Sequence, residues 1–282
     1  MPLTDQECTA LRAKAAELRK EMINVTGWAG GGHIGGSLSM AEMLTLLYFK
    51  YLRIDPKNPA WDDRDRFVLS KGHGGLGHAV VLAHRGYSDP ELLREFNHFC
   101  SRFGMHLDAA KVPGVDVSTG SMGHGLGQAV GLALGARIQG KVWRVYCIVG
   151  DGECHEGSIW EAAMAAAHFR LDNLTVFLDR NHFCIDGNTE DVMALEPLGE
   201  KWKSFGWQVD QVDGHNLRQL AEAIDRAKSH RGSPVLILAQ TIKGKGVDFM
   251  ENKPAWHYGA LNSELIDKAK ASIDRNGLAG AS

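Results

Sequence analysis

The chain has 282 residues, of which 44% are hydrophobic and 23% charged, values typical of a soluble globular protein with a sizeable core. Its formal net charge of -3 argues against a general binder of nucleic acids or anionic membranes, which needs a basic surface. No apolar run approaches the roughly 20 residues of a membrane span. The N-terminal segment also lacks the apolar core of a signal peptide, so we expect a cytoplasmic protein.

The first half of the chain predicts helices and one short strand. Apolar residues recur at helical spacing over residues 11–22 and 40–51, and the glycine-rich segment 27–37 between them predicts a loop. Residues 66–70 read as a short apolar strand, followed by the sequence KGHGG. Small apolar residues over 122–139 are typical of a buried helix.

From residue 142 onward, short apolar runs alternate with helical patterns. We predict strands over 142–149, 174–178, 207–212 and 234–240, and helices over 158–169, 195–204 and 217–228. Such alternation indicates a mostly parallel sheet flanked by helices on both faces. We therefore expect one doubly wound α/β domain across residues 1–282, with ligands bound beyond the carboxyl ends of the strands.

The five cysteines are Cys8, Cys100, Cys147, Cys154 and Cys184. Their number is odd and they form no Cys-x-x-Cys pair, which argues against a disulfide scaffold or a structural zinc site. This usage fits a reducing cytoplasm.

One stretch predicts a site for magnesium and a diphosphate. Gly150 and Gly152 flank Asp151 directly after a predicted strand, and glycines let the backbone approach phosphate closely. A helix beginning near residue 158 would favour an anion at its N-terminus. Asn181 follows the next strand, so Asp151, Asn181 and the carbonyl of Phe183 would share an octahedral Mg²⁺ with phosphate oxygens and water. The alternative is a simple tight turn, with Asn181 as a cap.

Several blocks of the chain, in order, resemble transketolases. They are GGHIGGSLSMAEML, DRDRFVLSKGHG, GMHLDAAKVPGVDVSTGSMGHGLGQAVGLALGA, GDGECHEG with NHFCIDG, and TIKGKGVDFMENKPAWHYG. The likeness covers nearly the whole chain. It implies the diphosphate-binding (PP) type of thiamine diphosphate fold, with Mg²⁺ as the metal and Ca²⁺ or Mn²⁺ as substitutes. It also implies metal ligation by Asp151, Asn181 and the Phe183 carbonyl, with Ile185 near the thiazolium ring.

Four of the thirteen histidines lie in glycine-rich or turn-like segments: His33, His73, His106 and His257. Loop histidines at strand ends are good active-site candidates because imidazoles exchange protons near neutral pH. A structural role is the alternative for each of them. The resemblance implies that His33 and His257 contact the reacting oxygen and the diphosphate region. It places His73 beside the cofactor and His106 at the substrate hydroxyls.

The resemblance assigns further cofactor contacts. Gly120, Ser121 and Met122 would lie against the aminopyrimidine ring, and Lys243 would direct a positive charge toward the diphosphate or substrate. An exposed lysine is the alternative for Lys243.

Two glutamates and two histidines complete the comparison with the family pattern. Glu156 and Glu161 resemble glutamates that line the interface between transketolase active sites, and Glu156 is included among the cofactor-binding residues. His124 stands where the family usually has glutamine, in Gly-Gln-Gly. His182 also departs from the usual residue, although only its neighbour's backbone is expected to matter.

Thiamine catalysis needs a carboxylate hydrogen-bonded to the aminopyrimidine. In full-length transketolases it belongs to a pyrimidine-binding domain, and this chain ends at Ser282 without one. We therefore expect the N-terminal subunit of a split transketolase, inactive alone. With a separate C-terminal subunit, in an α2β2 heterotetramer, it would transfer a two-carbon ketol unit from a ketose phosphate to an aldose phosphate.

Three competing functions are the alternatives, and only the first is fully compatible with these residues. One is a split ketol-transferase for an unusual sugar, such as a sulfo- or branched sugar. Another is the α subunit of a thiamine-dependent 2-oxoacid dehydrogenase, and the last is a non-catalytic binding subunit. The SKGHG and GMHLDAAKVPGVD blocks argue against the second, and the intact Asp151, Asn181, His33 and His257 argue against the third. The residues of this chain do not choose the sugar.

Overall fold

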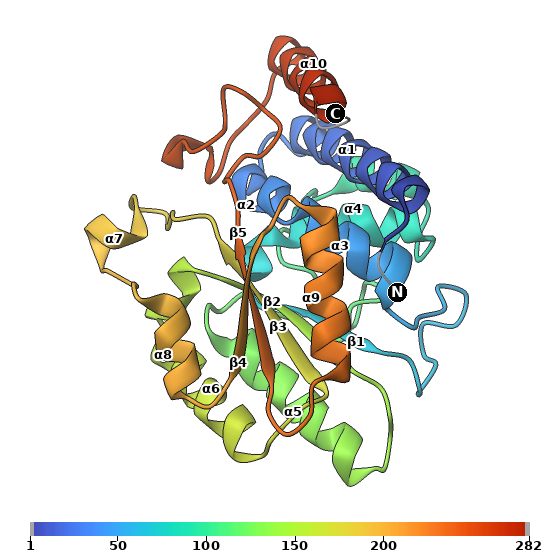
Figure 1. The fold of residues 1–282 in the computed structure, drawn as a ribbon. Coiled ribbons are helices and arrows are strands. Elements are labelled where there is room, and N and C mark those ends of the chain that lie inside the picture. Colours follow the sequence, from blue (N-terminus) through green and yellow to red (C-terminus); the bar gives the residue numbers. More distant parts are fainter. Residues whose placement is uncertain (1–2, 280–282) are drawn as a thin grey trace.

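The computed structural model describes residues 3–279 of the chain. Its centre is a five-stranded sheet in which every neighbouring pair is parallel. In spatial order the strands are β1 (Arg66–Leu69), β2 (Val145–Gly150), β3 (Leu174–Arg180), β5 (Val235–Gln240) and β4 (Gln208–Asp213). Because each parallel connection requires a crossover, helices cover both faces, as Figure 1 shows. The predicted α/β fold is confirmed.

Ten α-helices surround the sheet within residues 3–279. They are α1 (Asp5–Trp28), α2 (Ile34–Ser39), α3 (Ala41–Leu46), α4 (Gly75–Arg85), α5 (His124–Ile138), α6 (Gly157–His168), α7 (Thr189–Val192), α8 (Leu198–Ser204), α9 (Leu217–Ser229) and α10 (Ser263–Ala279). A short π-helical segment, Leu47–Tyr51, continues α3. None of these helices combines the length and apolar character needed to cross a bilayer.

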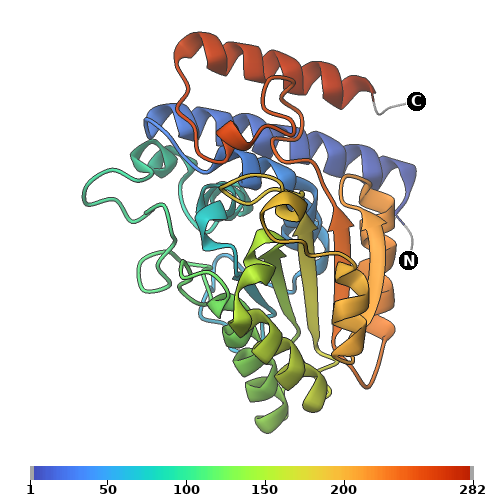
Figure 2. The same cartoon turned by 90° about the vertical axis from the view of Figure 1, so that its left-hand side faces the viewer.

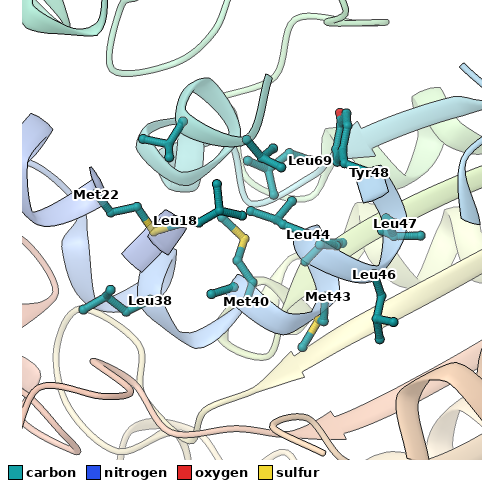
Figure 3. Packing of buried hydrophobic residues seen from close by; sticks show 14 of the residues in the cluster. Leu18, Met22, Leu38, Met40, Met43, Leu44, Leu46, Leu47, Tyr48 and Leu69 are labelled. Atoms are coloured by element: carbon teal, nitrogen blue, oxygen red, sulfur yellow. The ribbon is translucent and has the colours of Figure 1, made fainter. Parts of the chain in front are cut away.

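The strands alternate their side chains between two apolar layers. In β5, Val235 and Ile237 pack in the layer that contains α1–α4, α9 and α10, whereas Leu236 and Leu238 pack in the layer of α5, α6 and α8. This two-residue period follows from strand geometry. Figure 3 shows the first layer from close by, where side chains of α1 such as Met22 meet those of α2 and α3.

The first and last helices of the described chain lie side by side. α1 begins with a capping box, in which the Thr4 hydroxyl accepts from the Glu7 N–H and the Glu7 carboxylate accepts from the Thr4 N–H. One side of α1 faces the core and α10 packs beside it (Figures 1 and 2). Segments from both ends of the sequence therefore meet in one outer layer.

Several local predictions differ from the structure. The predicted loop over 27–37 is wrong in part because Ile34–Ser39 form α2; this helix needs a glycine at Gly35, where a Cβ would press on the Trp256 carbonyl oxygen at 2.6 Å. The strand predicted from residue 142 begins at Val145, since Val142 is 81% exposed. The helices α4 and α10 were not predicted.

Candidate active site

A cavity of about 430 Å³ lies at the carboxyl ends of β1, β2, β3 and β5. Of the residues predicted for the site, those that line it are His33, His73, His106, Gly120, Met122, Gly150, Asp151, Gly152, Glu156, Asn181, Phe183, Ile185, Lys243 and His257. Ser121 is exposed and does not line the cavity. The structure thus brings together residues from separate segments of the chain at the sheet edge where parallel α/β proteins bind ligands.

Asp151 is buried at the end of β2, with 1% of its surface exposed. Its Oδ1 accepts a hydrogen bond from the Gly152 N–H at 2.8 Å, and its Oδ2 accepts from Arg180 at 3.0 Å and from the His182 N–H at 2.6 Å. Burial and the nearby charge of Asp179 raise the pKa of Asp151, against the lowering effect of Arg180. A bound cation would favour the ionised carboxylate.

Asn181 presents its amide oxygen beside the same cavity. Its Nδ2 donates to Asp179 at 3.2 Å, which fixes the orientation of the amide, and its Oδ1 accepts from the Phe183 N–H at 3.2 Å. Carboxylate, amide and carbonyl oxygens are hard donors of the kind that Mg²⁺ prefers. Within residues 3–279 no group of three or more His, Cys, Asp or Glu side chains is placed to hold a metal. The mixed oxygen set is thus the donor chemistry that fits a magnesium ion.

The glycines of the GDG turn do not adopt positive φ angles. Their use is close packing, because a Cβ at Gly152 would lie 3.1 Å from the Cβ of Cys184. Positive φ occurs instead at Gly123, the N-cap of α5, with φ 83°. A side chain there would also collide with Ser158 at the start of α6. Gly123 therefore lets the first turns of α5 and α6 meet beside the cavity.

The four predicted histidines form one cluster around His33. Its ring centroid lies 5.3 Å from those of His73 and His257, and 6.5 Å from that of His106. An antiparallel bridge between Gly32 and Gly259, with both N–H···O distances 3.0 Å, holds the segments of His33 and His257 together. Imidazoles from distant regions of the sequence are thereby gathered along one wall.

Burial lowers the pKa of three of these imidazoles, which favours their neutral form. Burial, helped by the charges of His106 and Lys243, lowers the pKa of His33 to about 4. Burial and Lys243 lower the pKa of His257 to about 3, and burial likewise lowers the pKa of His73. The Nδ1 of His33 is buried without a hydrogen-bond partner among the described residues, which is the condition of an atom that can bind a ligand.

Lys243 is only 2% exposed, so the alternative of an exposed lysine is wrong. Its Nζ donates to His257 Nδ1 at 2.8 Å and lies 3.4 Å from the Phe183 carbonyl oxygen. Burial and the charge of Lys71 lower the pKa of Lys243 to about 8. A buried ammonium beside a cavity is a strong attractor for an anion such as a diphosphate.

Four buried charged residues at this edge were not predicted from the sequence: Lys71, Glu153, Asp179 and Arg180. Lys71 donates to Asp179 and, at 2.7 Å, to the Gly36 carbonyl. Glu153 accepts from Ser70 at 2.6 Å and from the N–H groups of two glycines, one before α5 and one at the end of β2. These pairings, together with the one between Arg180 and Asp151, join loops that are remote in sequence. The signal that could have found them is a charged residue directly after an apolar strand, as in VLSK and FLDR.

His124 and His182 are the two residues that depart from the transketolase pattern. His124 is exposed at the start of α5 and so does not replace a buried amide. His182 has a left-handed backbone with φ 67°, and its own N–H binds Asp151. The expectation that only its neighbour's backbone matters is therefore wrong. Glu161 is exposed on α6, and Glu156 precedes that helix at the cavity rim.

The sequence and the fold both match known proteins. Residues 12–277 match the transketolase, thiamine diphosphate binding domain family. This chain therefore belongs to that family and corresponds to the N-terminal part of a transketolase. Thiamine diphosphate is the cofactor that these enzymes use, together with a divalent metal.

Some relatives are about as long as this chain, and others are more than twice as long. A 6-deoxy-6-sulfo-D-fructose transketolase subunit, SqwG, from a Clostridium species is 45% identical and covers 95% of this chain and 97% of its own length. An apulose-4-phosphate transketolase subunit from Actinobacillus succinogenes is 38% identical, covering 92% and 94%. The solved transketolase of Campylobacter jejuni has a TM-score of 0.90 and 31% identity over 96% of this chain, but this chain spans only 43% of it.

Proposed function

We propose that this chain is the N-terminal subunit of a split transketolase, which transfers a two-carbon ketol unit between sugars together with a second subunit. The observation that carries the proposal is the cavity itself. It combines the oxygen donors for Mg²⁺, a buried lysine and a cluster of four imidazoles, and it does so on a chain as long as the separate subunits that it resembles.

Each group in the cavity has a distinct role in this proposal. Asp151, Asn181 and the Phe183 carbonyl hold Mg²⁺, while Lys243 binds the diphosphate. The thiamine diphosphate supplies a nucleophilic thiazolium carbon when bound. His33 and His257 hold and move protons at the sugar oxygen, which neutral imidazoles do well because they can both donate and accept.

The second subunit supplies the part of a transketolase that this chain does not resemble. The solved transketolases are more than twice as long as their matched segment, and the resemblance places the aminopyrimidine-binding carboxylate in that remainder. In this chain Ile185 is 66% exposed beside the cavity, so a partner surface is needed to shield the cofactor from water. We propose an α2β2 assembly in the cytoplasm, where five cysteines without a disulfide are stable.

Two classes of sugar are candidates for the substrate of this reaction. A pentose phosphate pathway ketose phosphate is one candidate. A sulfo- or branched sugar is the second, and it is favoured by the 45% identity to the sulfofructose subunit, compared with 37% to human transketolase.

Reconstitution tests the proposal directly. The chain is purified alone and also co-expressed with the product of a neighbouring reading frame that resembles the rest of a transketolase. We expect ketol transfer, measured with a panel of ketose phosphates and 6-deoxy-6-sulfo-D-fructose, only from the mixture. Strong activity of the chain alone would contradict the split arrangement.

The same assay separates ketol transfer from the two remaining functions. Oxidation of 2-oxoacids with an artificial electron acceptor would instead identify a dehydrogenase component. A reconstituted pair that binds no thiamine diphosphate would indicate a non-catalytic role.

A further inference from the structure

Arg180 is a completely buried arginine at the last position of β3. Its Nη1 donates to Asp151 Oδ2 at 3.0 Å and to the Thr189 hydroxyl at 2.7 Å. Its Nη2 donates to Glu190 at 2.8 Å and to Glu196 at 3.0 Å, and its Nε also donates to Glu196. The guanidinium therefore joins the Asp151 carboxylate to the segment formed by residues 188–197.

The hydrogen bonds to Asp151 are distributed unevenly between its two oxygens. An ionised carboxylate has about four acceptor sites, two on each oxygen. Arg180 and the His182 N–H use both sites of Oδ2, while the Gly152 N–H uses one site of Oδ1. The second site of Oδ1 remains for a cation. The carboxylate is thus arranged as a one-oxygen ligand.

A positive charge next to a cation-binding carboxylate has an electrostatic cost. By Coulomb's law, the guanidinium repels a divalent cation bound at Asp151. The planar fork of an arginine can hold a carboxylate in one orientation, which the single ammonium of a lysine cannot do.

We propose that Arg180 is a positioning residue for the divalent cation. It holds Asp151 in the orientation that presents Oδ1 to the metal, and it ties that orientation to the segment 188–197. This inference rests on the magnesium site of the proposed function. It concerns a residue that does not line the cavity.

The sign of one substitution tests the inference. If Arg180 acted only through its charge, Arg180→Met would tighten Mg²⁺ binding because repulsion would be removed. If Arg180 positions Asp151, the same change weakens Mg²⁺ binding by roughly tenfold, the equivalent of one charge-assisted hydrogen bond. Arg180→Lys, which keeps the charge but loses the fork, should also weaken it.

The measurement is calorimetric titration of Mg²⁺ into the chain with saturating thiamine diphosphate. The matched control is Arg144→Met, because Arg144 flanks the opposite end of the sheet and donates to the carbonyls of Asp172 and Lys228. We expect wild-type affinity from this control. Equal or tighter Mg²⁺ binding by Arg180→Met, or full affinity of Arg180→Lys, would overturn the inference.

A second readout needs no metal. In the metal-free chain, the amides of Gly152 and His182, which donate to Asp151, should exchange hydrogen faster in Arg180→Met and Arg180→Lys than in wild type or Arg144→Met. Unchanged exchange in both Arg180 variants would overturn the inference. If Arg180→Met does not fold, the Mg²⁺ affinity and the amide exchange of Arg180→Lys test the inference instead. Failure of the wild-type chain to bind Mg²⁺, both alone and reconstituted with the second subunit, would instead count against the proposed function, and the exchange rates would still decide the role of Arg180.

Discussion

The middle of the sheet and its carboxyl edge are both buried, but the middle contains apolar side chains and the edge contains charged ones. In the middle, Val68, Cys147 and Val176 pack among apolar neighbours, and such burial stabilises the fold by about 25 cal/mol per Å². A few residues further along the same strands, Lys71 and Asp151 are equally buried, although burying a charge is strongly unfavourable unless it is paired.

The difference shows which part of the molecule is built for stability and which for a ligand. At the edge, charges are paired with one another across loops, as in the ion pairs of Lys71 with Asp179 and of Arg180 with Asp151. Replacing both partners of such a buried pair by well-packed apolar residues is often neutral or stabilising, so the fold itself does not require these charges. Substitutions in the middle should therefore reduce stability, whereas substitutions at the edge should first reduce binding.

The largest effect is expected from the apolar layer. Trp202 of α8 is fully buried, with ring centroids 4.9 Å from Trp207 and 5.5 Å from Trp160. Trp202→Ala should lower the free energy of unfolding by about 3–5 kcal/mol because it leaves a large cavity. Chemical denaturation measures this. Trp202→Phe is the control and should cost much less, since it keeps an aromatic ring in the same space.

Asp151→Ala tests the edge. It should weaken thiamine diphosphate binding in the presence of Mg²⁺ by about 100-fold or more, roughly 3 kcal/mol, because the proposed metal ligand is removed. Folding should be preserved, since Arg180 keeps Glu190 and Glu196 as partners. Calorimetry measures the affinity, and the exposed Asp191, changed to Ala, is the control. Normal binding by Asp151→Ala would show that the metal ligands are assigned wrongly.

Acid should lower the stability of the fold because of His78, which is buried in the apolar layer. This fully buried residue hydrogen-bonds Tyr48 at 2.8 Å, and burial lowers its pKa from 6.5 to about 3. The unfolded chain therefore binds a proton more readily, and stability falls as the pH drops from 6.5 toward 3. At pH 5 this contribution amounts to about 2 kcal/mol.

His78→Gln removes the titrating ring but keeps a polar partner for Tyr48. Denaturant melts at pH 7 and pH 5 should show a smaller loss of stability on acidification for this variant than for wild type. An identical loss in both proteins would assign the acid sensitivity to other groups.

The smallest expected effect concerns Lys243. With a pKa of about 8, its ammonium loses its proton as the pH rises through that value, and an anion binds the protonated form better. Thiamine diphosphate affinity should therefore decline above pH 8, approaching tenfold per pH unit. Calorimetry between about pH 7.5 and 9.5 measures the slope around that pKa. Lys243→Met should bind more weakly and show a flatter profile, and an equally steep profile would exclude Lys243 as the cause.

The sequence was sufficient to predict the sheet and most of the residues around the cavity, because the strands are short apolar runs and the site residues follow them. It was insufficient where three-dimensional pairing decides the outcome. The FLDR pattern marks Arg180 as a charged residue at a strand end, but it does not identify Asp151, Glu190 and Glu196 as its partners. Helix α4, which follows the glycine-containing segment after β1, was likewise not predicted.

The bridge between Gly32 and Gly259 has a consequence for how the protein is made. His33 leaves the ribosome well before His257 and α10. Domains begin to fold during synthesis, from the N-terminal side, so the sheet can assemble while one wall of the cavity is still missing. We therefore expect the cofactor pocket to close only after Gly259 has emerged from the ribosome, so that shorter nascent chains can fold but cannot yet capture cofactor.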